Sequence, residues 1–69
     1  MTLGNRIRSR REELGLNQVE LAEKSRLTQA TISRIESDKL MPKATTLIVL
    51  ATSLDLAPDE FLKEERRAS

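Results

Sequence analysis

Two helical patterns separated by only three residues constrain the fold of this chain most. The first pattern begins at Asn17, with Glu20 three residues later as in a capping box, and ends near Lys24 or Ser25. The second begins at Thr28, a residue type that caps helix N-termini. Because so short a link leaves no room for a loop, the two helix axes are expected to cross steeply.

The apolar residues of this stretch indicate how the two helices pack. The expected inward positions are Val19, Leu21, Ala22, Ile32 and Ile35. Ala22 is small enough to let the helices approach each other, and Leu27, in the link, is expected to anchor the turn in the core. The stretch therefore predicts a closely packed pair of crossed helices.

Helical patterns also flank this pair. Upstream, apolar residues recur at helical spacing between a cap residue, Thr2, and a stop residue, Gly15. Downstream, residues 44–54 carry an apolar stripe, and Asp55 follows where a left-handed residue ends a helix. The members of these two apolar sets are Leu3, Ile7 and Leu14 upstream and Leu47, Leu50, Ala51 and Leu54 downstream.

Two prolines mark the remaining segments. Residues 37–43 lack periodicity and include Pro42, which forbids a continuous helix, so they are expected to form a loop. Pro58 suits the first turn of a fifth helix, which would carry Phe61 and Leu62 as its apolar pair. The chain is therefore predicted to contain five helices.

Composition supports an all-α fold with a small core. Hydrophobic residues make up 38% of the 69 residues, and Phe61 is the only aromatic, which suits helices packed through aliphatic side chains better than a sheet. We therefore expect one compact domain over residues 1–64, followed by a charged tail at residues 65–69.

The residue types that are missing exclude several functions. The chain has neither cysteine nor histidine, so disulfides, structural zinc sites and the usual nucleophile–base pairs are ruled out. No apolar run approaches the roughly 20 residues of a membrane span, and the N-terminus lacks the apolar core of a signal peptide. We expect a soluble, cytoplasmic protein that is not an enzyme and that uses no metal, cofactor or small-molecule substrate.

The net charge of +1 is divided unevenly along the chain. Residues 1–43 contain nine Lys and Arg against six Asp and Glu, whereas residues 44–69 contain three against five. A modestly basic end and an acidic end result. This asymmetry is enough to orient the molecule on phosphates without binding them indiscriminately.

With these elements placed, the chain resembles the phage-repressor and Cro-like helix-turn-helix family, also called the XRE family. The resemblance lies in the segments LGNRIRSRREELGLNQVELAEKS, LTQATISRIE, TTLIVLATSLDL and APDEFL. The spacing of Gln18, Leu21, Ala22, Ile32 and Glu36 comes with flanking helices in the family's order, which makes the likeness specific. It implies a compact, five-helix, lambda-repressor-like domain whose third helix lies in the major groove of double-stranded DNA.

The resemblance assigns base readout to the outer face of the third helix. The implied residues are Thr28, Gln29, Ala30, Thr31, Ser33 and Arg34. Their chemistry fits, because Gln pairs with adenine N6 and N7, Arg pairs with guanine O6 and N7, and Ala or a Thr methyl touches the thymine methyl. Gln29 and Arg34 are the expected readers of sequence.

Phosphate contacts are expected near the N-terminal end of the second helix. Asn17 and Gln18 would present backbone and side-chain N–H groups to an anion there. Lys39, Lys43 and Arg10 are expected on neighbouring phosphates.

The resemblance also implies a structural ion pair, and three residues depart from the family pattern. Arg11 and Glu36 are expected to join the first helix to the end of the third. Arg26 stands at the turn position where the family usually has glycine, so either it adopts positive φ or the turn is altered. Asp38 also replaces a common glycine, and Lys43 replaces the usual serine cap of the fourth helix.

These residues favour a transcriptional regulator, most simply a dimeric repressor on a palindromic operator. The expected dimer interface consists of Leu56, Ala57, Pro58 and Phe61. Two alternatives stay open. An activator of the same fold would use an acidic surface, and a protein-interaction module such as an antitoxin would bind a protein partner instead of DNA.

Overall fold

Four helices form the described part of the chain. The computed structural model describes residues 2–57 and residue 59. The helices are α1 (Leu3–Glu13), α2 (Gln18–Ser25), α3 (Gln29–Glu36) and α4 (Ala44–Ser53), and none of the described residues belongs to a strand. The all-α prediction is therefore confirmed. Apart from residue 59, the residues of the predicted fifth helix, Pro58 and Phe61 among them, lie outside the described residues.

Side-chain caps fix where three of these helices begin. The Thr2 side chain accepts a hydrogen bond from the Asn5 N–H, and the Thr28 side chain accepts one from the Thr31 N–H. Asn17 forms the predicted capping box with Glu20, in which each side chain pairs with the other's backbone N–H. Lys43 provides no such bond to the start of α4. The predicted starts of α1, α2 and α3 are thus confirmed, and α4 begins without a side-chain cap where Lys43 replaces the usual serine.

Each of the four helices is followed, one or two positions after its last residue, by a residue with left-handed backbone conformation. In each case the N–H after this residue bonds to a carbonyl five residues earlier, as Leu27 does to Ala22 at 2.9 Å. The left-handed residues are Gly15 (φ 72°), Arg26 (φ 60°), Asp38 (φ 60°) and Asp55 (φ 56°). Arg26 therefore keeps the usual turn and bears the positive φ, at a cost of roughly 1–2 kcal/mol.

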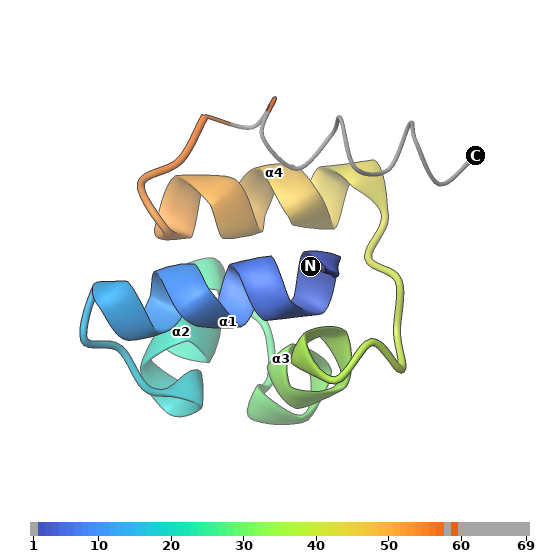
Figure 1. The fold of residues 1–69 in the computed structure, drawn as a ribbon, viewed down its shortest axis with the longest axis horizontal. Helices are drawn as coiled ribbons and strands as arrows, with labels where there is room; N and C mark the ends of the chain where they lie inside the picture. Colours follow the sequence, from blue (N-terminus) through green and yellow to red (C-terminus); the bar gives the residue numbers. More distant parts are fainter. Residues whose placement is uncertain (1, 58, 60–69) are drawn as a thin grey trace.

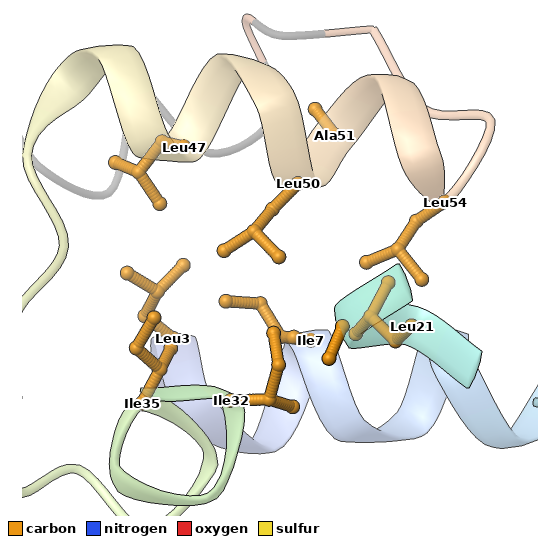
Figure 2. Close-up of a cluster of buried hydrophobic side chains, with 10 residues drawn as sticks. Leu3, Ile7, Leu21, Ile32, Ile35, Leu47, Leu50, Ala51 and Leu54 are labelled. Carbon is orange, nitrogen blue, oxygen red and sulfur yellow. The ribbon is translucent and has the colours of Figure 1, made fainter. Parts of the chain in front are cut away.

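One aliphatic core joins the four helices. In Figure 1, α4 runs above α1 and roughly parallel to it, and α2 and α3 lie mostly below α1. Figure 2 shows leucines of α4 pointing toward Leu3 and Ile7 of α1 and toward Ile32 and Ile35 of α3. The buried set consists of Leu3, Ile7, Leu21, Ala22, Ile32, Ile35, Leu47, Leu50, Ala51 and Leu54, with Leu14, Leu27 and Leu56 packed against it. Because Ile32 and Ile35 are buried in this core, the opposite face of α3 points to solvent.

Val19 is the residue for which the core prediction is wrong. Its side chain is 44% exposed, whereas Leu21, two residues later, is fully buried. Successive residues of an α-helix are about 100° apart, so positions two apart point to nearly opposite faces. With Leu21, Ala22 and Ser25 facing inward, Val19 faces solvent.

The first turn of α1 packs directly against the end of α3. Gly4 is buried there, and its N–H donates to Asp38 Oδ1 at 3.1 Å. The Thr2 hydroxyl donates to Asp38 Oδ2 at 2.7 Å. The Asp38 carboxylate therefore binds the positive end of α1 and joins it to the segment that follows α3. None of the described helices has the length and apolarity needed to cross a lipid bilayer.

Candidate nucleic-acid interface

The outer face of α3 is a polar surface supported by the core. Gln29, Ala30, Ser33 and Arg34 are all exposed, while Ile32 and Ile35 on the opposite face are buried. Spacings of one, three and four residues place these four exposed side chains on one face of a helix. The structure thus brings together four of the six residues predicted for base readout.

The other two predicted readers, Thr28 and Thr31, bond to each other at the start of α3. Their hydroxyl oxygens are 2.9 Å apart, and Thr28 Oγ1 also accepts from the Thr31 N–H at 3.1 Å. Thr28 is exposed and Thr31 is half-buried. Since one of the two hydroxyls donates to the other, these residues offer a ligand their methyl groups, one hydroxyl proton and the remaining oxygen lone pairs.

A single carboxylate connects α3 to α1 and to the start of α2. Arg11 Nε donates to Glu36 Oε2 at 2.7 Å, and Arg11 Nη2 donates to Glu36 Oε1 at 3.0 Å. Gln18 Nε2 donates to Glu36 Oε1 at 3.2 Å, and Arg11 Nη1 donates to the Leu16 carbonyl at 2.8 Å. The predicted ion pair is present, and it is a bidentate pair within a larger network.

This network is buried and fully hydrogen-bonded. Arg11 is 8% exposed and Glu36 is 6% exposed. The hydrogen bond to Glu36, partly opposed by burial, raises the pKa of the Arg11 guanidinium above its ordinary value. No buried side-chain nitrogen or oxygen among the described residues lacks a hydrogen-bond partner. The network therefore fixes the start of α2 relative to the end of α3.

The N-terminal end of α2 has fewer free donors than the sequence suggests. The Asn17 N–H donates to Glu20 Oε1 at 2.9 Å, and Asn17 Oδ1 accepts from the Glu20 N–H at 2.7 Å. Gln18 uses one of its two amide N–H bonds on Glu36. What remains for an anion is the Asn17 side-chain amide, the second amide N–H of Gln18 and the first-turn backbone N–H groups of Gln18 and Val19.

The predicted phosphate-binding cations lie in different places. Lys39 and Lys43 are exposed on the segment between α3 and α4. Arg10 is half-buried, and its Nε donates to the Leu54 carbonyl at 3.0 Å, which joins α1 to the end of α4. Its side chain therefore satisfies one of the carbonyls left open at a helix C-terminus. The phosphate role of Arg10 stays a prediction that this geometry does not favour.

Only half of the predicted dimer interface lies within the described residues. Leu56 is half-buried and packs against the core, and Ala57 is exposed. Pro58 and Phe61 lie outside the described residues. Over residues 2–57 and 59, no cluster of carboxylates is arranged to hold a metal ion.

Sequence reasoning missed two contacts that shape this interface. The bond from Gln18 to Glu36 crosses between α2 and α3, and the bonds from α1 to Asp38 join segments more than 30 residues apart. For the second contact, the sequence offered only the replacement of a common family glycine by Asp38, which marks the position as unusual but does not indicate its partners in α1. Nothing in the sequence indicates the first.

The fold and the α2–α3 geometry define a helix-turn-helix domain. The model of the helix-turn-helix family HTH_3 matches residues 7–61, and the chain belongs to this family. The chain is 38% identical over 65 residues to the immunity repressor protein of Bacillus phage phi105, covering 94% of this chain and 45% of that protein. It is 39% identical over 64 residues to the transcriptional regulator PuuR of Escherichia coli (strain K12), covering 93% of this chain and 35% of that protein.

Solved structures show the same fold. The DNA-binding domain of the P22 c2 repressor in solution superposes with a TM-score of 0.85 at 32% identity, covering 91% of this chain and 83% of that one. The P22 c2 repressor in complex with a synthetic operator gives 0.84 at 31% identity, covering 93% and 97%. The chain thus spans less than half the length of the curated relatives it matches, but nearly all of the P22 c2 chain solved on its operator.

Proposed function

We propose that this chain binds double-stranded DNA in a sequence-specific manner and regulates transcription, with α3 in the major groove. The observation that carries this proposal is the exposed face of α3, formed by Gln29, Ala30, Ser33 and Arg34. Gln and Arg are the side chains that pair bidentately with adenine and guanine, and Ala30 suits a thymine methyl. Related repressors with this fold, including one solved on its operator, support the assignment.

The buried network gives the α3 face its orientation on the duplex. Glu36 binds Gln18 at the start of α2 and Arg11 on α1, so the anion-binding end of α2 and the reading face of α3 are held in one geometry. Phosphate contacts fix register, and base contacts specify sequence. In our proposal the remaining amide N–H of Gln18, the Asn17 amide, Lys39 and Lys43 contact the backbone beside the groove.

We further propose that the protein acts in the cytoplasm as a dimeric repressor on a palindromic operator. One recognition helix touches too few base pairs to select a site in a genome, so two copies related by a twofold axis are needed. Leu56 and Ala57, with Pro58, Phe61 and the predicted fifth helix, are the proposed contact region. Such a role requires no catalytic residue, metal or cofactor.

Replacement of Gln29 by alanine is expected to weaken binding to the preferred site by roughly tenfold to a hundredfold. This is the value of one lost bidentate contact between a side chain and a base. Because Gln29 is exposed, the variant should remain folded, and binding to unrelated duplexes should be unchanged. Fluorescence anisotropy with a selected duplex and a scrambled duplex measures both affinities.

The matched control is Lys39→Ala, which removes an exposed cation and no base contact. This variant should weaken binding to both duplexes equally and reduce the dependence of log K on log salt by about one unit. Equal loss on both duplexes for Gln29→Ala, or no loss at all, would show that Gln29 does not read a base.

A further inference from the structure

An open groove lies between the end of α2 and the outer face of α4, away from the α3 reading face. It has a volume of about 410 Å³, and none of its lining residues belongs to α3. Its large aliphatic lining residues, called the floor below, are Ile48 and Val49, each 41% exposed. These two large aliphatic side chains are neighbours on α4, and each is exposed to solvent. Together they form a small apolar surface that no described residue covers.

The hydroxyl groups around this floor do not make it polar. Thr52 Oγ1 donates to the Ile48 carbonyl and Ser53 Oγ donates to the Val49 carbonyl, each at 2.9 Å. Ser25 Oγ donates to the Leu21 carbonyl at 2.7 Å. Since each hydroxyl proton is used within its own helix, the groove presents mainly methyl and methylene groups.

The charged lining residues of the groove, called the rim below, are cationic. Lys24 and Arg26 line it at the end of α2, both are exposed, and no carboxylate is among the described residues that line it. A ligand that fits must therefore bring negative charge for the rim and apolar side chains for the floor. A DNA backbone supplies the first and not the second, whereas an acidic amphipathic helix supplies both.

From this charge complementarity we propose that the groove binds an acidic, leucine-bearing helical segment of a protein partner. The partner's carboxylates pair with Lys24 and Arg26, and its aliphatic side chains cover Ile48 and Val49. Because α3 takes no part in the groove, a partner and a duplex can bind the same molecule at once. The protein thereby gains a second recognition surface that is independent of its proposed DNA contacts.

The test uses the 69-residue chain without DNA and a fluorescein-labelled, glutamate-rich peptide with leucines spaced four residues apart. The peptide should bind, and amide chemical-shift changes should be confined to residues 24–26 and 48–53. Lys24→Glu with Arg26→Glu should weaken binding about tenfold, and Lys24→Glu alone should weaken it severalfold. Circular dichroism melts of each variant verify folding.

Three controls make the result decisive. Arg8→Glu changes net charge as Lys24→Glu does but lies outside the groove, and it should leave peptide affinity unchanged. A peptide with lysine in place of glutamate, or serine in place of leucine, should bind at least about tenfold more weakly. Equal binding of either control peptide, or full affinity of the double variant, would overturn the proposal.

Two further measurements, sedimentation of the chain and duplex binding by the double variant, test two other occupants of the groove: a second copy of this chain and DNA. If the chain sediments as a dimer that Val49→Glu disperses, and the peptide does not bind, the groove is a contact between copies and the proposal is wrong. It is equally wrong if the double variant loses affinity for duplex DNA while the peptide never binds. Neither outcome bears on base readout by Gln29, so this inference and the proposed function fail independently.

Discussion

Replacement of Glu36 by leucine is expected to lower the free energy of unfolding by roughly 3–5 kcal/mol. The change leaves the Arg11 guanidinium, which is 8% exposed, without its bidentate partner, and it also removes the acceptor of Gln18. A buried cation without a counter-charge retains its desolvation cost and loses its compensation. Urea unfolding followed by circular dichroism measures the loss.

The double variant Arg11→Met with Glu36→Leu distinguishes an ion pair from simple packing. It should be several kcal/mol more stable than the sum of the two single losses predicts, because no charge is then left unpaired. The exposed pair of Arg8 and Glu12, 3.5 Å apart with side chains 60% and 56% exposed, is the control within the same helix. Arg8→Met should cost less than about 1 kcal/mol. Additive losses at Arg11 and Glu36 would contradict the account.

Replacement of Gly4 by alanine is expected to destabilise the fold by about 3 kcal/mol, near the upper end of overpacking effects. An added Cβ would lie 2.5 Å from the Ile35 carbonyl oxygen and 2.7 Å from the Glu36 carbonyl oxygen. Both are backbone atoms of α3, so α1 must move away from α3 to make room. Asp38 Oδ1, also 2.7 Å away, would lose its bond to the Gly4 N–H in the process.

Gly15→Ala provides the matched control, since it adds the same methyl group where space is open. Nothing lies within 4 Å of a Cβ at Gly15, but its φ of 72° makes the backbone unfavourable for alanine. That cost is roughly 1–2 kcal/mol. Thermal and urea unfolding of the two variants should rank Gly4→Ala as the more damaging. The opposite order would show that α1 and α3 are not in close contact at this point.

Local signals explain why the helices could be predicted from the sequence. Thr2, Asn17 and Thr28 begin helices because their side chains accept a bond from the first turn, which depends on residues three apart. The stripe of Leu47, Leu50 and Leu54 is buried as its spacing predicts. Val19 shows the limit, because an aliphatic residue type alone does not tell which face of a short helix turns inward.

The features that could not be predicted from the sequence are contacts between segments far apart in the chain. The closeness of Gly4 to Ile35 and the bonds of Asp38 to α1 depend on how α1 packs against α3, and no pattern in either segment reports that packing. The exposed face of α3 was predictable because it is the complement of Ile32 and Ile35. The pairing of Gln18 with Glu36 was not, since the two residues lie 18 positions apart on different helices and neither helix pattern reports their contact.

Selection of bound sites from random duplex DNA tests the central claim, that α3 reads sequence, most directly. At low salt, where phosphate contacts are strongest, the chain should enrich a palindrome whose half-site centres are about 34 Å, one helical turn, apart. Selection with Gln29→Ala should relax the preference at one position in each half-site and leave the others unchanged. Enrichment of no site at all, with the protein folded at low salt, would contradict the account.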